Sequence, residues 1–476
     1  MGKKSIITFI LFATSFSLCA QEEAKNSALL NDSLVARFNR KDFRSMWLLG
    51  SDDWKKKNPS PGDFAAYMRW LDNKSGSITA SSPSGRRANT VSFLWTGSRK
   101  TLIMELRDPS SQGYNDINFS VYVSDNQLSA VGTDNVLKNA IDSAVDGLVR
   151  RYMVENSIVG MSIGITINNR PYTYNYGSVE RGKIQLPTDR TLYDLGSIGK
   201  TITATLLAHA ILDKKVLPDD DIRKYLPGRY PNLEYRGNPI RLVHLANYTS
   251  GLPSDIPHDL RNFSPGEVLH FYNTYTVAEF FNDFHTVRLD TIPGTRYLYS
   301  SSAVALLAAI LERVYHKSYA ELVQKFVSNP MNMDDTRVNM EGEKDSGKFA
   351  RGYTVDGIVT HWTFGPTRSL GGVHSSVHDM LLFLQQNIIE QDPAVRLSHQ
   401  QTTQLGIPGD ESGLGWFIEP TARGIQIEKG GNSPRHSSDC VIIREKKMGV
   451  VCLANEAGLE LRDLSESILD KLMSAF

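Results

Sequence analysis

The chain has 476 residues and a mass of 53.1 kDa, which is more than one typical domain requires. Its 41% apolar and 22% charged residues are close to the averages of soluble globular proteins, so the composition excludes a disordered, collagen-like or polytopic membrane protein. Because 52 basic side chains balance 52 acidic ones, bulk charge gives no reason to expect nucleic acid or an anionic membrane as a partner. Three cysteines cannot build a disulfide scaffold.

The first residues are typical of a secretory signal peptide. Lys3 and Lys4 precede an apolar run over 6–16, and a stretch of small residues ends at Ala20. The run is too short to cross about 30 Å of hydrocarbon comfortably as a helix. We therefore expect cleavage of residues 1–20, export across the inner membrane to the periplasm, and no membrane span in the mature chain. An uncleaved anchor and a lipid attached at Cys19 are the alternatives.

Residues 25–128 are expected to form a small α+β domain. Two stretches with helical spacing of apolar residues come first and three strand-length runs follow, at 29–49, 63–73, 89–97, 100–108 and 117–125. Helices followed by antiparallel strands suggest an α+β unit. The segment weakly resembles the nuclear-transport-factor-like cone domains that accompany some exported bacterial enzymes. It carries no catalytic constellation, so we expect a spacer or docking module.

A polar stretch over 129–136 is typical of a linker, and residues 137–476 are expected to form the second, larger domain. Thr133 or Asp134 is expected to cap a helix over 136–153. After this helix, the sequence Asn168-Asn169-Arg170 predicts the tight turn of a β-hairpin.

A second hairpin is expected near the C-terminus, with its turn at 445–447. Cys440 and Cys452 flank that turn and could face each other across two strands. A disulfide is permitted in an oxidising compartment, but we favour two buried free thiols. Beyond the hairpin, an apolar stripe predicts an amphipathic helix packed on a sheet, with the residues Leu461, Leu464, Ile468 and Leu472.

The segment over 194–212 contains the only Ser-x-x-Lys of the chain, from Ser197 to Lys200. Apolar residues recur every four positions after it, which predicts a helix with Lys200 one turn from Ser197 and on the same face. A serine hydroxyl is a poor nucleophile until a neighbouring base takes its proton, and a lysine can serve if burial and nearby cations depress its pKa. A helix N-terminus also offers N–H groups to a developing oxyanion.

Two further elements would be ordinary if they stood alone. Tyr299 follows a turn at Pro293 and Gly294 and precedes an apolar helix, where a tyrosine is by default a packing residue. The triad Lys429-Gly430-Gly431 ends an apolar strand, and glycines at a strand edge let another backbone approach closely.

In this order and spacing, the Ser-x-x-Lys, Tyr-x-x and Lys-x-Gly motifs resemble the serine β-lactamase and penicillin-binding-protein superfamily. The closest resemblance is to its class C β-lactamase and D-alanyl-D-alanine carboxypeptidase/esterase branch. Four more stretches are similar to that branch, at 245–253, 369–380, 413–418 and 450–456. The resemblance covers roughly 137–476. It implies an α+β, β-lactamase/transpeptidase-like fold: an antiparallel sheet with flanking terminal helices, and an all-α subdomain between roughly 200 and 370. The active site should lie where the two meet.

The resemblance also implies roles for single residues. Ser197 attacks a carbonyl and becomes acylated, while Lys200 and Tyr299 share the proton transfers. Lys429 biases Tyr299 toward the phenolate and helps to hold an anionic substrate. The backbone N–H groups of Ser197 and Asn432 form the oxyanion hole, on a strand that binds the substrate as an added β-strand. No cofactor or metal is required.

Three positions depart from the pattern of that branch. Ser301 stands where many relatives have Asn, and Gly430 stands where penicillin-handling relatives have Thr or Ser. Pro434-Arg435-His436 replaces small or apolar residues. Arg435 could make a bidentate contact with a substrate carboxylate, or be an exposed arginine in a loop. These departures leave acyl-serine chemistry in place but speak against efficient β-lactam hydrolysis.

Other polar and aromatic residues are expected to be structural. His374 and His378 are four residues apart, but Ser376 and Asp379 predict a helix start that leaves His374 outside the helix and argues against a zinc site. Three aromatic residues could line a cleft, but aromatic side chains are more often in the core, so we expect core positions for Trp362, Phe364 and Trp416.

The sequence therefore predicts an exported serine hydrolase that acts through an acyl-Ser197 intermediate on peptide, ester or β-lactam carbonyls. Its partner would be a small-molecule or peptide substrate, with cell-wall peptide and β-lactams as candidates. Ser301 and Gly430 motivate an alternative, a non-catalytic or single-turnover penicillin-binding sensor that uses the same cleft.

Overall fold

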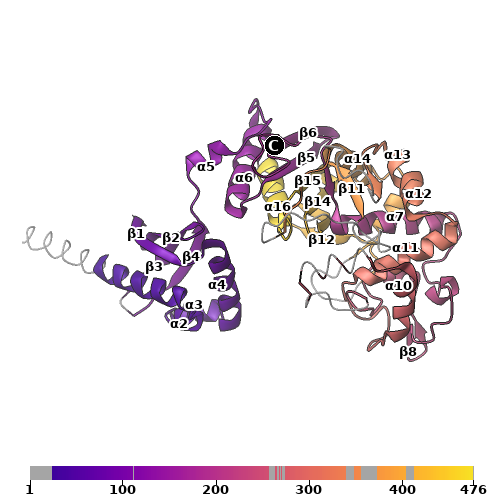
Figure 1. Ribbon diagram of the computed structural model, residues 1–476, viewed down its shortest axis with the longest axis horizontal. Coiled ribbons are helices and arrows are strands. Elements are labelled where there is room, and N and C mark those ends of the chain that lie inside the picture. The colour runs from indigo at the N-terminus through magenta and orange to yellow at the C-terminus, as the bar shows by residue number, and fades with distance from the viewer. Residues whose placement is uncertain are drawn as a thin grey trace, which may run out of the picture. The chain divides into compact units, whose positions relative to one another are not determined.

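The structure is a computed structural model that divides into two compact units, Met1–Asp125 and Asn126–Phe476 (Figure 1). It describes residues 24–110, 112–256, 263–264, 267, 270, 274–338, 348–354, 372–403 and 412–474. The expected signal peptide with Cys19, and also Trp362 and Phe364, lie outside the described residues. Among the helices of the described residues, none has the length and apolar character that a membrane crossing needs.

The first unit is the expected small α+β domain. Its helices come first, over residues 24–39 and at α2 (Phe43–Leu48), α3 (Asp52–Lys57) and α4 (Pro61–Ser75). An antiparallel sheet of order β1-β2-β3-β4 follows, formed by Ile78–Arg87, Thr90–Gly97, Thr101–Arg107 and Asp116–Val121. The helices and the sheet share one core, in which Phe38 and Trp95 are fully buried with their rings 5.5 Å apart.

Two details of this unit differ from the sequence-based expectation. The stretch 29–49 is two helices, because Lys41 has a left-handed φ of 60° and the Asp42 side chain accepts a hydrogen bond from the Ser45 N–H, which starts α2. Strand β1 was not expected from the sequence. It is polar and mostly exposed and pairs only with β2, so it carries no alternating apolar pattern.

The second unit is built on a six-stranded antiparallel sheet of order β12-β13-β14-β15-β5-β6 (Figure 1). The strands are Phe417–Thr421, Gly424–Asn432, Ser437–Ile443, Met448–Ala454, Gly160–Ile167 and Arg170–Gly177, in that order. Helices α6 (Ala140–Asn156) and α16 (Leu461–Met473) cover one face, and the predicted stripe of α16 is buried there. The opposite face packs on α14 (Val377–Ile389) and on the helical part of the unit.

The expected linker, residues 129–136, is integrated into this second unit. Thr133 forms a bridge with Tyr176, and the Asp134 carboxylate accepts hydrogen bonds from the backbone N–H and the side-chain amide of Asn175. The cap proposed for the following helix was therefore wrong. Asn139 caps α6, accepting from the Asp142 N–H, since Thr133 and Asp134 bond to β6 instead.

Both expected hairpins are present. Asn168 and Asn169 join β5 to β6 with φ values of 51° and 63°, as a two-residue turn of type I′ requires. The turn at 444–447 joins β14 to β15. Cys440 and Cys452 are buried free thiols. The idea that they face each other was wrong, because Cys440 pairs with Val451 and so the two cysteines point to opposite faces of the sheet.

In the sequence, the helical part lies between β6 and β12 of the six-stranded sheet. It contains α7 (Gly199–Leu212), α8 (Leu242–Ala246), α10 (Val277–Asp283), α11 (Ser301–Tyr315), α12 (Tyr319–Val323) and α13 (Asn329–Met331). It is not entirely helical, since β8 (Glu234–Tyr235) pairs with β9 (Asn238–Pro239), and β10 (Arg337–Val338) joins β11 (Val373–Ser376) and β7 (Leu192–Asp194) in a small sheet. Helix α7 is buried on nearly all sides, and its buried residues include three threonines and Lys200 as well as apolar side chains.

Candidate active site

Four side chains predicted from motifs far apart in the chain meet in the second unit. Ser197 lies in one turn of 3₁₀ helix, Gly196–Ile198, that joins β7 to α7, and Lys200 lies in the first turn of α7. Tyr299 immediately precedes the Ser300 cap of α11, and Lys429 lies on β13. The site is therefore at the junction of the sheet and the helical part, as expected.

The Lys200 ammonium group donates a hydrogen bond to Ser197 Oγ over 2.7 Å. Lys200 is almost fully buried, whereas Ser197 and Tyr299 are partly accessible. Lys200 Nζ lies 5.1 Å from the centroid of the Tyr299 ring, and Lys429 Nζ lies 4.8 Å from it. The phenol therefore sits between two buried cations, next to the serine hydroxyl.

This arrangement changes the pKa of Tyr299. Burial alone would raise it, but the positive charges of Lys200 and Lys429 oppose burial, and hydrogen bonding with Ser197 and Lys200 adds to their effect. Together they lower the pKa of Tyr299 to about 7. A phenol with such a pKa can both accept and donate a proton near neutral pH.

Lys429 is held by a residue that the sequence interpretation missed. Burial is the main cause that lowers the pKa of Lys429 to about 8, although the neighbouring Tyr299 favours its charged form. Its Nζ donates to the hydroxyl of Tyr248 over 2.7 Å, and Tyr248 donates in turn to the Gly415 carbonyl. Tyr248 belongs to the stretch 245–253, whose family resemblance was the available signal.

Two glycines let the serine turn approach β13 closely. A Cβ on Gly431 would lie 2.2 Å from the Leu195 carbonyl oxygen and 2.9 Å from the Ser197 nitrogen. A Cβ on Gly196, whose φ is 51°, would lie 2.7 Å from the Asn432 nitrogen. Since no side chain fits at either position, the backbone of Ser197 and that of Asn432 come together, as an oxyanion hole made from their N–H groups requires.

Strand β13 extends beyond its neighbour β12. The pairing of these strands ends at Phe417 with Glu428, so within the described residues Lys429–Asn432 has no partner strand on that side. A peptide-like substrate could add there as a further strand. Gly430 faces away from Ser197, and a Cβ on it would meet Asp439 Oδ1 only at an ordinary 3.4 Å.

Two of the expected supporting residues do not make the contacts expected of them. Ser301 donates its backbone N–H to the Ser254 carbonyl, and within the described residues no hydrogen bond joins it to Lys200. Arg435 is neither an exposed loop residue nor a free carboxylate receptor. Its Nε and Nη2 donate to the Asp194 carboxylate over 2.7 and 3.0 Å. Asp194 therefore already occupies the guanidinium group that was expected to bind a substrate carboxylate.

The two histidines occupy different elements. His374 lies on β11, outside α14, and Ser376 caps α14 by accepting from the Asp379 N–H, as the sequence predicted. His374 Nδ1 lies 2.7 Å from Asp194 Oδ1. Across the described residues, no group of three or more His, Cys, Asp or Glu side chains could hold a metal ion. Trp416 is fully buried and stacks on Phe383 in the core.

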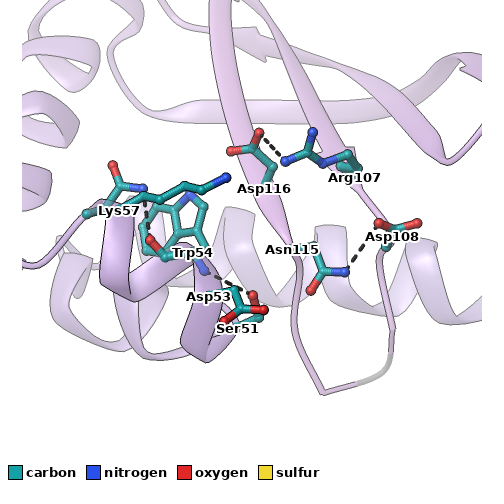
Figure 2. A pocket seen from close by; sticks show the side chains of 9 residues that line it. Ser51, Asp53, Trp54, Lys57, Arg107, Asp108, Asn115 and Asp116 are labelled. Carbon is teal, nitrogen blue, oxygen red and sulfur yellow. Dashed lines mark hydrogen bonds and ion pairs between the residues drawn. The ribbon is translucent and has the colours of Figure 1, made fainter.

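The first unit has a polar hollow of about 320 Å³ between α3 and the adjoining ends of β3 and β4 (Figure 2). Arg107 pairs with Asp116 at 3.0 Å, and the Asn115 amide donates to Asp108. Trp54 also lines the hollow, is nearly buried, and packs its ring edge-on against Tyr114. Because these polar groups bind one another, we assign the hollow no role.

A comparison with known protein families decides the affiliation of the second unit. Residues 145–472 match the family model described as Beta-lactamase. This chain belongs to the β-lactamase family. It is a serine hydrolase of that family with a β-lactamase/transpeptidase-like fold, as the motifs predicted.

Individual relatives agree with this affiliation. A β-lactamase of Escherichia coli (strain K12) is 26% identical over 360 residues, which cover 66% of this chain and 89% of that protein. The D-alanyl-D-alanine-carboxypeptidase/endopeptidase AmpH of the same strain is 25% identical over 355 residues, covering 68% and 87%. Among solved structures, a class C β-lactamase superposes with a TM-score of 0.61 at 22% identity, covering 71% of this chain and 98% of that one.

Proposed function

We propose that this protein hydrolyses peptide, ester or β-lactam carbonyls through a covalent acyl-Ser197 intermediate. The observation that carries the proposal is the Lys200–Ser197 hydrogen bond of 2.7 Å beside a phenol whose pKa is held near 7. The names of the relatives, β-lactamase and D-alanyl-D-alanine-carboxypeptidase/endopeptidase, support β-lactam and peptide carbonyls as substrates.

In the first step, Ser197 Oγ attacks the substrate carbonyl carbon and its proton passes to the Tyr299 phenolate. Lys200 holds the serine oxygen by its hydrogen bond, and the two lysines stabilise the phenolate before the transfer. The negative charge that develops on the carbonyl oxygen is bound by the N–H groups of Ser197 and Asn432. Tyr299 then gives the proton to the leaving group, and the C–N or C–O bond breaks.

In the second step, water hydrolyses the acyl-enzyme. Tyr299 takes a proton from the water as the water oxygen attacks the ester carbon, and it returns the proton to Ser197 Oγ as the ester bond breaks. The product acid leaves and the starting state is restored. Lys429 stays protonated throughout and, through its charge, keeps Tyr299 a weak enough base to cycle near neutral pH.

The test is a comparison of the chain lacking residues 1–20 with its Ser197→Ala variant. We expect Ser197→Ala to lower hydrolysis of a nitrophenyl ester by about 10³-fold or more and to abolish labelling by a fluorophosphonate. Ser465→Ala is the matched control, because Ser465 is a buried serine of α16 that bonds to Leu461 and Cys452. Unchanged labelling of Ser197→Ala would refute the acyl-serine proposal.

The substrate class needs a panel of three compounds: a chromogenic cephalosporin, a nitrophenyl ester and a D-Ala-D-Ala peptide. We expect the cephalosporin to be the poorest of the three, because the Arg435 guanidinium is occupied by Asp194 and cannot bind the β-lactam carboxylate. Cephalosporin turnover that exceeds turnover of the other two would contradict this expectation.

A single-turnover penicillin-binding sensor is the second candidate, motivated by Ser301 and Gly430. The two candidates differ after the first acylation. An enzyme continues to release product after a stoichiometric burst, whereas a sensor stops after one equivalent. Export to the periplasm by residues 1–20 remains part of the proposal, and the mass of the mature chain in a periplasmic extract tests it.

A further inference from the structure

The carboxylate of Asp194 joins segments that lie about 240 residues apart in the chain. Asp194 is the last residue of β7, three positions before Ser197, and it is fully buried. Its Oδ2 accepts hydrogen bonds from Arg435 Nε over 2.7 Å and from Ser433 Oγ over 3.0 Å, while Oδ1 accepts from Arg435 Nη2 over 3.0 Å. Both donors lie in the turn that follows Asn432.

That turn is itself closed by internal hydrogen bonds. The Ser433 N–H donates to the His436 carbonyl over 2.8 Å, and Ser433 Oγ accepts from the N–H groups of Arg435 and His436. His436 Nδ1 lies 3.1 Å from Asp194 Oδ2. The turn is therefore one compact body, and Asp194 holds it through a charged, bidentate contact and a serine hydroxyl.

A second hydrogen bond joins the segment before Ser197 to strand β14. Ser438 Oγ donates to the Leu195 carbonyl over 2.7 Å, one residue after Asp194 and two before Ser197. Close to these two sets of hydrogen bonds, Gly196 and Gly431 let the backbones of Ser197 and Asn432 approach each other. The spacing of the two N–H groups thus depends on the contacts of Asp194 with the turn and on the hydrogen bond from Ser438 to Leu195.

We propose that Asp194 is a positioning residue that fixes the Asn432 N–H relative to the Ser197 N–H in the oxyanion hole. Asp194 does not touch the substrate, and it acts through Arg435 and Ser433. The inference rests on the proposed acyl-serine function. An oxyanion donor displaced by a fraction of an ångström loses much of its effect, because such donors act by being preorganised.

The test compares the wild type with Asp194→Asn, which keeps the side-chain size but removes the charge that holds Arg435. We expect kcat for a nitrophenyl ester to fall about 10- to 100-fold while KM changes little, because the oxyanion exists only in the transition state. The affinity for phenylboronic acid, a probe that forms a tetrahedral adduct with serine, should fall by the same factor as kcat/KM. Thermal stability is measured in parallel.

Asp142→Asn is the matched control, because Asp142 is also a buried carboxylate of the second unit. It accepts from the Tyr174 hydroxyl and the Lys138 N–H. The Asp142→Asn variant should have a lower thermal stability than the wild type, but its kcat, KM and affinity for phenylboronic acid should be unchanged. Asp194→Asn with wild-type kcat and boronate affinity would overturn the proposal, and so would an equal loss in Asp142→Asn.

A second variant keeps the test decisive if Asp194→Asn does not fold. Arg435→Lys retains the charge but cannot make the bidentate contact, so it should lower kcat and boronate affinity together. Wild-type values for Arg435→Lys would then overturn the proposal. A wild-type protein that a fluorophosphonate fails to label would instead overturn the acyl-serine function, and this inference with it.

Discussion

The ammonium of Lys429 donates a hydrogen bond to the hydroxyl of Tyr248, with 2.7 Å between the two atoms. Both side chains are almost fully buried. The ammonium also lies over three aromatic rings, at 4.6 Å from the centroid of Tyr248, 4.8 Å from that of Tyr299 and 4.1 Å from that of Phe417. Aromatic faces and a hydroxyl oxygen stabilise the cation without neutralising it, so its charge still acts on Tyr299.

Removing that hydroxyl should change the pH dependence of the enzyme. Tyr248→Phe deletes the oxygen that accepts from Lys429 and leaves the ring in place. We expect the pKa of Lys429 to fall further, because its charged form loses a hydrogen bond, so the basic limb of kcat/KM should move to lower pH. Ester hydrolysis measured from pH 5 to 10 checks this. Tyr319→Phe, which removes a buried hydroxyl bonded to Thr203, should leave the profile unchanged.

The wild-type profile should itself be bell-shaped. Activity falls on the acid side as the Tyr299 phenolate is protonated, with its pKa about 7, and on the basic side as Lys429 loses its proton, with its pKa about 8. Because the two groups interact, the observed limbs belong to the pair.

The same pair predicts the effect of removing the second lysine. Lys429→Met deletes a positive charge beside Tyr299, so the pKa of Tyr299 should rise and the acid limb should move to higher pH. Lys429→Arg keeps the charge and should move the limb less. An acid limb that stays in place in Lys429→Met would show that Lys429 does not set the protonation of Tyr299.

Two neighbouring glycines should respond differently to the same substitution. Gly431→Ala places a Cβ 2.2 Å from the Leu195 carbonyl oxygen, so β13 and the serine turn must separate and activity should fall by at least about 10²-fold. Gly430→Ala meets its nearest neighbour at 3.4 Å and should retain activity and stability. Ester hydrolysis and thermal melting of the two variants check the contrast. Equal behaviour of the two would contradict the close approach described above.

A buried acid on the neighbouring strand β14 should make stability depend on pH. Burial raises the pKa of Asp439 from 3.8 to about 8, so the folded protein keeps it neutral where the unfolded chain ionises it. Its contribution to stability is complete below pH 4 and is lost as pH rises toward 8, by up to about 1.4 kcal/mol per pH unit. Asp439→Asn should therefore unfold at higher denaturant concentration than the wild type at pH 8, with little difference at pH 4.

Asp142→Asn provides a control of opposite sign. Burial opposes ionisation of Asp142, but hydrogen bonds from Tyr174, Lys138 and Asn139 outweigh it and lower its pKa. This carboxylate stabilises the fold above its unfolded pKa, so the variant should lose stability at pH 8 and less at pH 4. Denaturant midpoints of both variants at the two pH values distinguish the cases. A destabilised Asp439→Asn at pH 8 would show that Asp439 folds in its charged form.

The sequence alone determined the features that depend on local pattern. The spacing of Ser197 and Lys200 requires only one helical turn, and the Asn168-Asn169 hairpin requires only residues that tolerate positive φ. The apolar stripe of α16 likewise follows from its period. The order of the Ser, Tyr and Lys motifs then indicated the family, because together they form a rare combination.

Only the tertiary structure decided the contacts between distant segments. The Arg435 guanidinium donates to Asp194, about 240 positions earlier, and Lys429 donates to Tyr248, 181 positions earlier. Thr133 and Asp134 bond to β6 rather than cap a helix, and Cys440 and Cys452 take opposite faces because of the strand register. A buried polar group needs a partner, but which partner it finds depends on how strands and helices pack, and a linear pattern carries no record of that packing.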